Sequence, residues 1–252
     1  MIVAIIQARM GSNRLPGKVM KMIKGKPLLH YVLNQLQHSK FLEKIIVATT
    51  NLEEDDIIEK FVLKEGFDCF RGNSKNVLDR YYHCAKSNSI SSILRITADC
   101  PLIDPNLVDS VIKKFENEKF DYVSNAFPRT FPYGTEVEIF SFNSLKISWE
   151  KAVKPSEKEH VTPYIKNHPE IFKIGNIESD KNLSDYRWTV DRIEDLELVK
   201  QIIIKINKKF ILTEDILKLI QKEPQLKEIN NNITSNEGMM KSLKEDAEFL
   251  EK

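Results

Sequence analysis

A glycine-containing basic segment near the N-terminus, residues 5–20 (IIQARMGSNRLPGKVM), carries the first residue types that could do chemistry. Arg9, Arg14 and Lys18 supply positive charge, and an arginine fork matches the geometry of phosphate oxygens. Gly11 allows the backbone to approach a ligand closely. Because an apolar strand-like run precedes this segment and a helical pattern follows it, we expect a polyphosphate-binding loop rather than a solvated basic loop.

Two well-known phosphate motifs do not fit this segment. The P-loop requires G-x-x-x-x-G-K-[ST], whereas Gly11 and Gly17 are separated by five residues and Val19 follows Lys18. The dinucleotide fingerprint G-x-G-x-x-G is absent. The segment therefore predicts neither a P-loop ATPase nor a dinucleotide-binding enzyme.

Two aspartates follow strand-like segments, Asp99 in TADCP and Asp191 in TVDRIED. Each alone would fit a turn or helix cap. Together in a protein with a basic loop they predict a magnesium site, since magnesium needs only one or two carboxylates beside water and phosphate. We expect Asp→Asn changes there to spare folding, or even to favour it, by relieving repulsion. Asp104 and Asp195 are expected to be structural.

Polar residues for a hydroxyl-rich acceptor lie further along the chain. Glu136 and Glu138 in YGTEVEIF would share one strand face, either toward a substrate or toward solvent. Glu159 and His160 could bind a sugar or deprotonate a hydroxyl, although a lone histidine is more often structural. Arg187 could hold an acceptor carboxylate or phosphate. If the attacking group of the acceptor is a phosphate rather than a hydroxyl, no general base is needed to remove a proton from it.

The elements that must position these residues alternate between strand and helix. Strands are expected at 2–8, 44–50, 67–72, 91–97 and 121–126, and helices at 27–37, 54–66, 77–86 and 105–117. Such alternation predicts an α/β protein with a mostly parallel, three-layer sheet. Ligands of these sheets bind beyond the carboxyl ends of the strands, where the basic loop and TADCP both lie.

The pattern changes after residue 127. Residues 134–140 alternate and residues 172–177 read as another half-exposed strand, so we expect a small antiparallel extension that covers the sugar side or forms a dimer contact. Residues 186–191 should return to the core, and 195–205 should be helical. We expect one domain over residues 1–225 and a polar C-terminal tail over 226–252, in which a short helix could form.

Composition limits the classes of function. The chain has 252 residues, 41% hydrophobic and 30% charged, with a net charge of +1. This balance argues against a nucleic-acid or membrane-surface binder. The cysteines, Cys69, Cys84 and Cys100, cannot all pair with one another, which favours a reducing cytoplasmic setting. No apolar run reaches the ~20 residues of a membrane span, and MIVAII is too short for the core of a signal peptide.

Several motifs, in order, resemble the spore coat polysaccharide biosynthesis protein F family: QARMGSNRLPGK, VLDRYY, RITADCPLIDP, HVTPY and RWTVDRIEDLELV. That family is similar to the CMP-KDO synthetases and other sugar-activating cytidylyltransferases. The resemblance covers nearly the whole chain, with Asn13 where threonine is usual. It implies a Rossmann-like nucleotidyltransferase (nucleotide-diphospho-sugar transferase) fold, CTP and Mg2+ as nucleotide and metal, and an activated sugar or similar product.

The resemblance also implies roles for single residues. The nucleotide would contact Ala8, Arg9, Gly11, Ser12, Arg14 and Lys18, with Arg71 and Asp79 near the base and ribose. Asp99 and Asp191 would hold the metal, and Arg9, Lys18 and Asp99 would act in catalysis. The choice of cytosine rests on the resemblance, and Arg80 is expected to be a solvated helix charge. Related synthetases suggest a homodimer with contacts from residues 134–141 and the helix before HVTPY.

Two other classes of function compete with this hypothesis. A nucleotide-sugar-dependent glycosyltransferase would need a D-x-D metal motif, which TADCPLID lacks. A non-catalytic nucleotide-binding protein would not need Arg9, Lys18, Asp99 and Asp191 together. Release of pyrophosphate from CTP and an acceptor separates a cytidylyltransferase from a glycosyltransferase.

Overall fold

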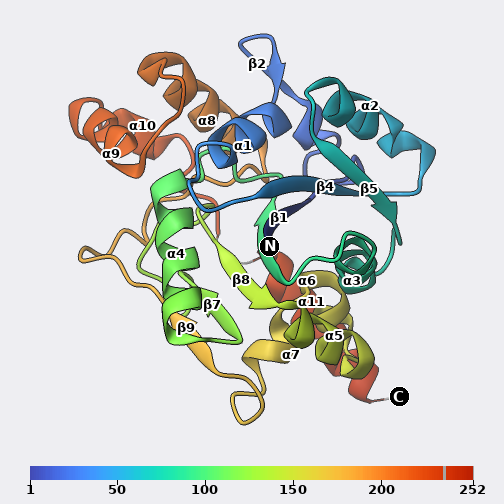
Figure 1. Ribbon diagram of the computed structural model, residues 1–252. Helices are drawn as coiled ribbons and strands as arrows, with labels where there is room; N and C mark the ends of the chain where they lie inside the picture. The colour runs from blue at the N-terminus through green and yellow to red at the C-terminus, as the bar shows by residue number, and fades with distance from the viewer. Residues whose placement is uncertain (235–236, 252) are drawn as a thin grey trace.

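The computed structural model describes residues 1–234 and 237–251, and it is built on a seven-stranded sheet with helices on both faces (Figure 1). The strand order is β5-β4-β1-β6-β8-β7-β9. The strands of this sheet are β1 (Ile2–Gln7), β4 (Lys44–Thr50), β5 (Asp68–Gly72), β6 (Ser92–Thr97), β7 (Tyr122–Ser124), β8 (Glu138–Ser141) and β9 (Ile174–Asn176). A separate hairpin is formed by β2 (Met22–Ile23) and β3 (Lys26–Pro27).

The helices carry the rest of the chain across the two faces of the sheet. They are α1 (Leu28–Leu36), α2 (Asp56–Lys64), α3 (Val77–Ser87), α4 (Pro105–Glu118), α5 (Phe142–Lys151), α6 (Pro155–His160), α7 (Pro163–Lys166), α8 (Ile193–Ile206), α9 (Thr213–Lys222), α10 (Gln225–Glu228) and α11 (Glu237–Leu250), with the 3-10 turns η1 (Lys18–Met20) and η2 (Glu53–Asp55).

Successive side chains of β1 point to opposite faces of the sheet, and helices cover both faces, which gives three layers. Ala4 and Ile6 pack into the core formed with α1, α2 and α4. Val3 and Ile5 point to the opposite face, where α3, α5 and α7 cover the sheet. Burial on both faces explains why this strand reads as a continuous apolar run. The predicted three-layer α/β fold is confirmed.

Successive strands are added on one side of β1 and then on the other, and the candidate site lies at this point of the sheet. After β1 the chain moves through α1 to β4 and β5 on one side, then returns through α3 to β6 on the other. All of these strands pair in parallel. The carboxyl ends of β1 and β6 therefore meet at a topological switch point, where such sheets bind ligands.

The expected antiparallel extension is present, but its burial differs from the prediction. β8 pairs antiparallel with both β6 and β7, so it lies inside the sheet and is buried rather than half-exposed. Most side chains of residues 134–141 are buried, which removes this segment as the expected dimer contact. β9 pairs parallel with β7, which corrects its antiparallel assignment.

Residues 186–191 belong to the core without forming a strand. Trp188 and Val190 are buried with α8 and α9 in a third apolar cluster. A single bridge joins Tyr133 to Arg187. Asp191 thus follows an extended segment that crosses the end of the sheet, rather than a strand within it.

The C-terminal residues do not form the polar tail expected from residue 226. Leu226 is buried against α9, and α11 packs along α6 at the lower right of Figure 1. Asp246 of α11 accepts hydrogen bonds from the backbone nitrogen and the hydroxyl of Ser156, at 2.8 and 2.5 Å. Positions 235, 236 and 252 of the predicted tail lie outside the described residues. The sequence of α11 reads as a polar tail because the helix buries only one narrow face, which carries the polar residues Ser242 and Asp246.

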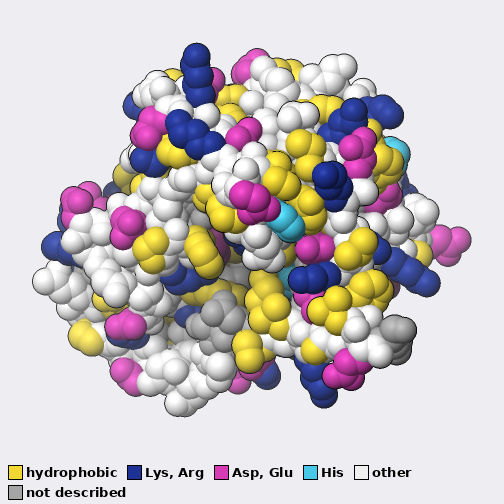
Figure 2. Space-filling view, turned by 90° about the horizontal axis from the view of Figure 1, so that it is seen from below, with side chains coloured by type: hydrophobic (Ala, Val, Ile, Leu, Met, Phe, Trp, Pro, Cys, Tyr) yellow, Lys and Arg dark blue, Asp and Glu magenta, His cyan; other side chains and the backbone are white. Residues whose placement is uncertain are grey.

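Three further features concern the surface charges, the cysteines and the length of the apolar helices. Basic and acidic side chains are interspersed on the face shown in Figure 2, without a large patch of one sign. All three cysteines are free thiols, and Cys84 and Cys100 are buried. Among the described residues, no helix is both long and apolar enough to cross a bilayer.

Candidate active site

The basic loop after β1 folds back on itself at the end of the sheet. The backbone nitrogens of Ser12 and Gly17 both donate to the carbonyl of Met10, at 2.8 and 2.9 Å. Gly17 has a φ of 65°, a left-handed conformation that favours glycine. This turn directs Lys18, at the start of η1, back toward the sheet.

Asp55 fixes the start of the loop, and sequence analysis did not identify it. Its carboxylate is fully buried and accepts from the backbone nitrogen of Met10 at 2.6 Å. It also accepts a hydrogen bond from the hydroxyl of Thr50, at the end of β4. A buried carboxylate needs such partners, so Asp55 ties the loop after β1 to the end of β4.

Lys18 joins the two aspartates that were predicted to hold a metal. Its Nζ lies 2.5 Å from Oδ2 of Asp99 and 2.8 Å from Oδ1 of Asp191. Burial lowers the pKa of Lys18, but the charges of both carboxylates outweigh this and raise its pKa above the usual value. Burial also raises the pKa of Asp191, yet Lys18 and Arg14 bring it down to about 2.

Backbone contacts bring the two aspartates together. The nitrogen of Val190 donates to the carbonyl of Asp99 at 2.8 Å, and the hydroxyl of Thr189 donates to the same carbonyl at 3.3 Å. Gly134 packs directly against the same segment. Its φ is 97°, and a Cβ built on it would lie 2.2 Å from the nitrogen of Thr189. Only glycine fits there without displacing the backbone, a role that sequence analysis missed.

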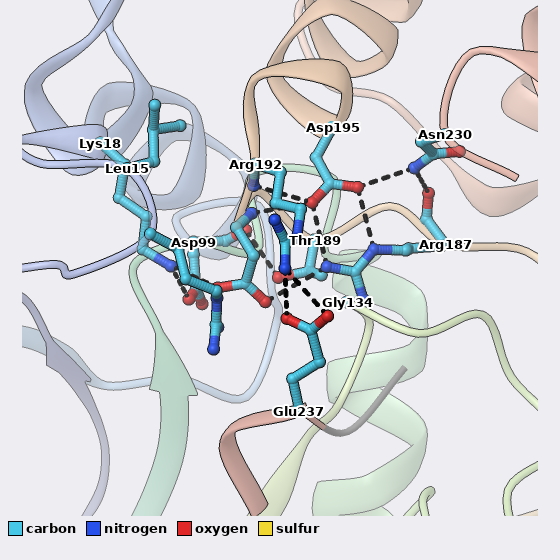
Figure 3. Close-up of polar contacts among 12 residues, drawn as sticks. Leu15, Lys18, Asp99, Gly134, Arg187, Thr189, Arg192, Asp195, Asn230 and Glu237 are labelled. Atoms are coloured by element: carbon cyan, nitrogen blue, oxygen red, sulfur yellow. Dashed lines mark hydrogen bonds and ion pairs between the residues drawn. The ribbon is translucent and has the colours of Figure 1, made fainter. Parts of the chain in front are cut away.

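Further polar contacts hold Asp191, and Figure 3 shows the neighbouring group in which Arg187 points toward Asp195. Nη2 of Arg14 lies 2.6 Å from Oδ1 of Asp191, and Nη2 of Arg187 lies 3.2 Å from its Oδ2. Arg187 also donates to both oxygens of Asp195 at 2.9 Å. The amide of Asn230 donates to Oδ1 of Asp195 at 2.8 Å. Arg187 therefore orients Asp191. It also lines a pocket together with Asn230, and its contact with an acceptor stays a prediction.

The two aspartates expected to be structural have structural contacts. Asp195 is fully buried at the first turn of α8 and accepts from the backbone nitrogens of Asp191 and Arg192, both at 3.0 Å. Asp104 caps α4 through the nitrogen of Asn106 and also accepts from the nitrogen of Thr213, both at 2.8 Å. Asp195 does more than cap, because it also fixes Arg187.

The remaining loop residues lie around this centre. Arg9 reaches across to Glu159, with Nη2 3.1 Å from Oε1, and both side chains are well exposed. Ser12 accepts from the nitrogen of Leu15 at 3.4 Å. A Cβ on Gly11 would lie 3.1 Å from Oε1 of Glu54, so the backbone runs close to η2. Ala8 is buried at the end of β1.

Each of the predicted acceptor residues already has a side-chain partner in the fold. Strand β8 starts at Glu138, so Glu136 lies outside it and their expected common strand face was wrong. Glu138 is buried and accepts from the hydroxyls of Tyr122 and Thr162 at 2.6 and 2.7 Å. It also pairs with Arg95.

The ionisation of Glu138 follows from these partners. Burial raises the pKa of Glu138, but Lys166 and Arg95 hold it well below the usual range. Glu136 instead pairs with Arg129 and accepts from the nitrogen of Gly134 at 2.9 Å. Both glutamates therefore have structural partners in this arrangement.

His160 contacts the C-terminal helix. Its Nε2 lies 2.9 Å from the hydroxyl of Ser242. Burial, followed by the charges of Arg95 and Lys166, lowers the pKa of His160 to about 4. The ring is therefore neutral at pH 7, and its contact with Ser242 gives it a role in docking α11.

The residues expected near the base and ribose have local partners. Nη1 of Arg71 lies 2.5 Å from Asp56 and 3.0 Å from Glu59 of α2. Asp79 accepts from Nε1 of Trp149 at 2.9 Å. Arg80 is only 2% exposed, so its expected place as a solvated helix charge was wrong. Its Nη1 donates to the carbonyl of Asn73 at 2.6 Å.

The donor set at the centre suits a small hard cation. Within residues 1–234 and 237–251, no three His, Cys, Asp or Glu side chains gather to hold a metal ion. Asp99 and Asp191 nevertheless face one cationic centre, the ammonium of Lys18. Two carboxylates beside water and phosphate oxygens suffice for magnesium, so the residues fit this ion.

Comparisons with known proteins identify the family of this chain. The model of a family described as cytidylyltransferase matches residues 3–237. An uncharacterized protein of Methanocaldococcus jannaschii is 37% identical over 238 residues, 92% of this chain and 95% of that protein. The spore coat polysaccharide biosynthesis protein SpsF of Bacillus subtilis is 34% identical over 233 residues, 88% and 95% of the two chains. The solved structure of a cytidylyltransferase from Leptospira borgpetersenii superposes with a TM-score of 0.87 at 35% identity, covering 92% of this chain and 98% of that one.

Proposed function

Because the chain belongs to the cytidylyltransferase family, and is thus a nucleotidyltransferase, we propose that it condenses CTP with a sugar acid, sugar phosphate or similar acceptor and releases pyrophosphate. The product would be a CMP- or CDP-linked precursor for a surface polysaccharide. The name of the relative from Bacillus subtilis supports the polysaccharide context. Family membership favours this reaction over glycosyl transfer or non-catalytic nucleotide binding. We further expect a cytoplasmic enzyme.

One observation carries the proposal: Lys18 of the basic loop bridges Asp99 and Asp191 at the switch point of the sheet. A polyphosphate bound at the loop would attract the ammonium of Lys18 and the guanidinium of Arg14. Asp99 would then lose its cationic partner, and Asp191 would keep only Arg187, which it shares with Asp195. Another cation would therefore be needed to hold the two adjacent carboxylates in their ionised form. Asp99 and Asp191 would hold magnesium, which when bound would offset the negative charge that develops on the phosphate under attack.

The other loop residues would bind and orient the nucleotide. Arg9 is exposed beside the loop and can exchange Glu159 for a phosphate oxygen at low cost, since exposed ion pairs contribute little. Asp55 would keep the loop backbone in place during this exchange. Lys18 and Arg9 would stabilise the departing pyrophosphate. The expected homodimer stays a prediction, and its contacts must come from surfaces other than residues 134–141.

The test is a pyrophosphate-release assay with four nucleoside triphosphates against sugar acids, sugar phosphates and small phosphorylated acceptors, with magnesium present. We expect turnover with CTP. The Lys18→Ala variant should bind CTP more weakly by about 1–3 kcal/mol, as for a charge-assisted phosphate contact. Lys21→Ala, which removes a charge three residues away, is the matched control. Turnover with another nucleotide but not with CTP, or unchanged CTP affinity of folded Lys18→Ala, would contradict the proposal.

A further inference from the structure

An arginine next to the proposed metal ligand is paired with a carboxylate from the far end of the chain. Nη2 of Arg192 lies 3.0 Å from both carboxylate oxygens of Glu237, the first residue of α11. Arg192 directly follows Asp191. Figure 3 shows the Glu237 side chain extending from the start of the terminal helix toward Arg192, to which dashed lines join it.

The loop arginine lies beside the same carboxylate-bearing turn. A Cβ built on Gly238 would lie 3.8 Å from Nη1 of Arg14, and Nη2 of Arg14 contacts Asp191. Arg14 and Arg192 therefore both lie beside the start of α11. Arg192 pairs with the carboxylate of Glu237. Burial lowers the pKa of Arg14, but Asp191 and, to a smaller extent, the charge of Glu237 raise its pKa above the usual value. Two guanidinium groups beside one carboxylate also suit a phosphate group, since both anions offer paired oxygens to a guanidinium.

The contact between Glu237 and Arg192 is not needed to dock the helix. α11 is held on α6 by the hydrogen bonds from Ser156 to Asp246 and by the contact between Ser242 and His160. The side chains of Arg192 and Glu237 are 45% and 34% exposed, and such pairs stabilise a fold by only ~0.2–1 kcal/mol. The matched family model also ends at residue 237, so α11 extends beyond it.

We propose that Arg192, together with Arg14, binds the terminal phosphates of the nucleotide, and that Glu237 occupies this subsite as a competing carboxylate in the free protein. This inference rests on the proposed function, because it takes the basic loop to be the polyphosphate site. The helix bearing Glu237 then acts as an internal competitor that weakens the binding of triphosphate and pyrophosphate. A nucleoside monophosphate, which has no terminal phosphates, would not compete with Glu237.

The experiment is calorimetry at low ionic strength with magnesium, using inorganic pyrophosphate, CTP and CMP as probes. Glu237→Gln keeps the shape of the side chain and removes its charge, so it should tighten pyrophosphate and CTP binding by about 1.4- to five-fold, the range given by an exposed ion pair. CMP affinity should not change. Arg192→Gln should weaken pyrophosphate binding and remove most of the gain from Glu237→Gln in the double variant. Glu248→Gln, an exposed change on the same helix, is the control for net charge and should have no effect.

Unchanged or weaker pyrophosphate binding in Glu237→Gln would overturn the inference. So would an equal gain in Glu248→Gln, a full gain in the Arg192→Gln background, or a gain for CMP without one for pyrophosphate. If the wild-type protein binds neither CTP nor pyrophosphate, the proposed function fails and this inference fails with it. If the wild-type protein binds both and Glu237→Gln changes nothing, only this inference fails.

Discussion

Replacing Asp191 with asparagine should destabilise the metal-free protein, because the carboxylate is paired with Lys18, Arg14 and Arg187. The pKa of Asp191 is lowered from 3.8 to about 2 in the folded protein. At 1.36 kcal/mol for each pKa unit, this corresponds to about 2 kcal/mol of folding free energy at pH 7. Removing one member of a buried pair can cost ~3–5 kcal/mol. For Asp191→Asn the loss of folding free energy should stay at about 2 kcal/mol, because Lys18 keeps its contact with Asp99.

The pH dependence of this difference has a definite sign. A carboxylate with a lowered pKa stabilises the fold above its unfolded pKa of 3.8 and loses this effect as the pH falls toward 2. The difference in unfolding free energy between the wild type and Asp191→Asn should therefore be the same at pH 7 and pH 5. It should shrink only below about pH 4, where the unfolded chain begins to bind the proton.

Urea unfolding in the presence of EDTA, followed by the fluorescence of buried Trp188, measures this difference. Asp180→Asn, at an exposed position, is the matched control and should lie within about 0.5 kcal/mol of the wild type. Turnover of the folded Asp191→Asn variant should fall by two or more orders of magnitude, on the order of 3 kcal/mol in the barrier. An Asp191→Asn protein as stable as Asp180→Asn, or more stable than the wild type, would refute the role given to the ion-pair network.

Two further changes test the contacts around the site. Gly134→Ala should lower the free energy of unfolding in urea by about 3 kcal/mol or more, because its Cβ would meet the nitrogen of Thr189. Gly25→Ala is the control: Gly25 has a φ of 76° and open space around it, so its loss should be only about 1 kcal/mol. Equal losses for the two variants would contradict the close approach at Gly134. His160→Asn should flatten the pH dependence of stability between pH 6.5 and 4. The unfolded histidine binds a proton in this range while the folded one, with a pKa of about 4, does not, so stability is lost as pH falls, by at most about 3 kcal/mol. Identical slopes for the variant and the wild type in urea unfolding would remove His160 as the cause.

The sequence predicted the residues whose position follows from the sheet alone. Lys18 and Asp99 both follow strands of a parallel sheet, and the carboxyl ends of neighbouring parallel strands meet at one edge. Asp191 was predicted for the same reason, although the segment before it is not a strand. Its place at the site comes instead from the hydrogen bond of Val190 to Asp99 and from the close approach at Gly134. The position was correct because the segment still crosses the end of the sheet.

Residues that act through tertiary contacts gave no comparable signal. Asp55 lies in a charged run that reads as an ordinary helix start, yet it is the fully buried anchor of the loop. Arg80 looks like a surface charge at its place in α3, but the neighbouring strand covers it. Glu237 belongs to a polar segment whose burial is limited to a narrow stripe. Such residues depend on which distant segments meet, and neither periodicity nor a local motif encodes this.

The expectation that Asp→Asn would leave folding intact treated the two aspartates as an unpaired acidic cluster. In the folded chain, however, Lys18, Arg14 and Arg187 already balance Asp99 and Asp191. The loop cations cannot neutralise these carboxylates and a triphosphate at the same time. Under the proposed function, a nucleotide that draws Lys18 and Arg14 to its phosphates leaves the aspartates in need of a new partner. This exchange of partners is the physical reason for including a divalent cation in the proposal, and it links phosphate binding to the ionic contacts that stabilise the fold.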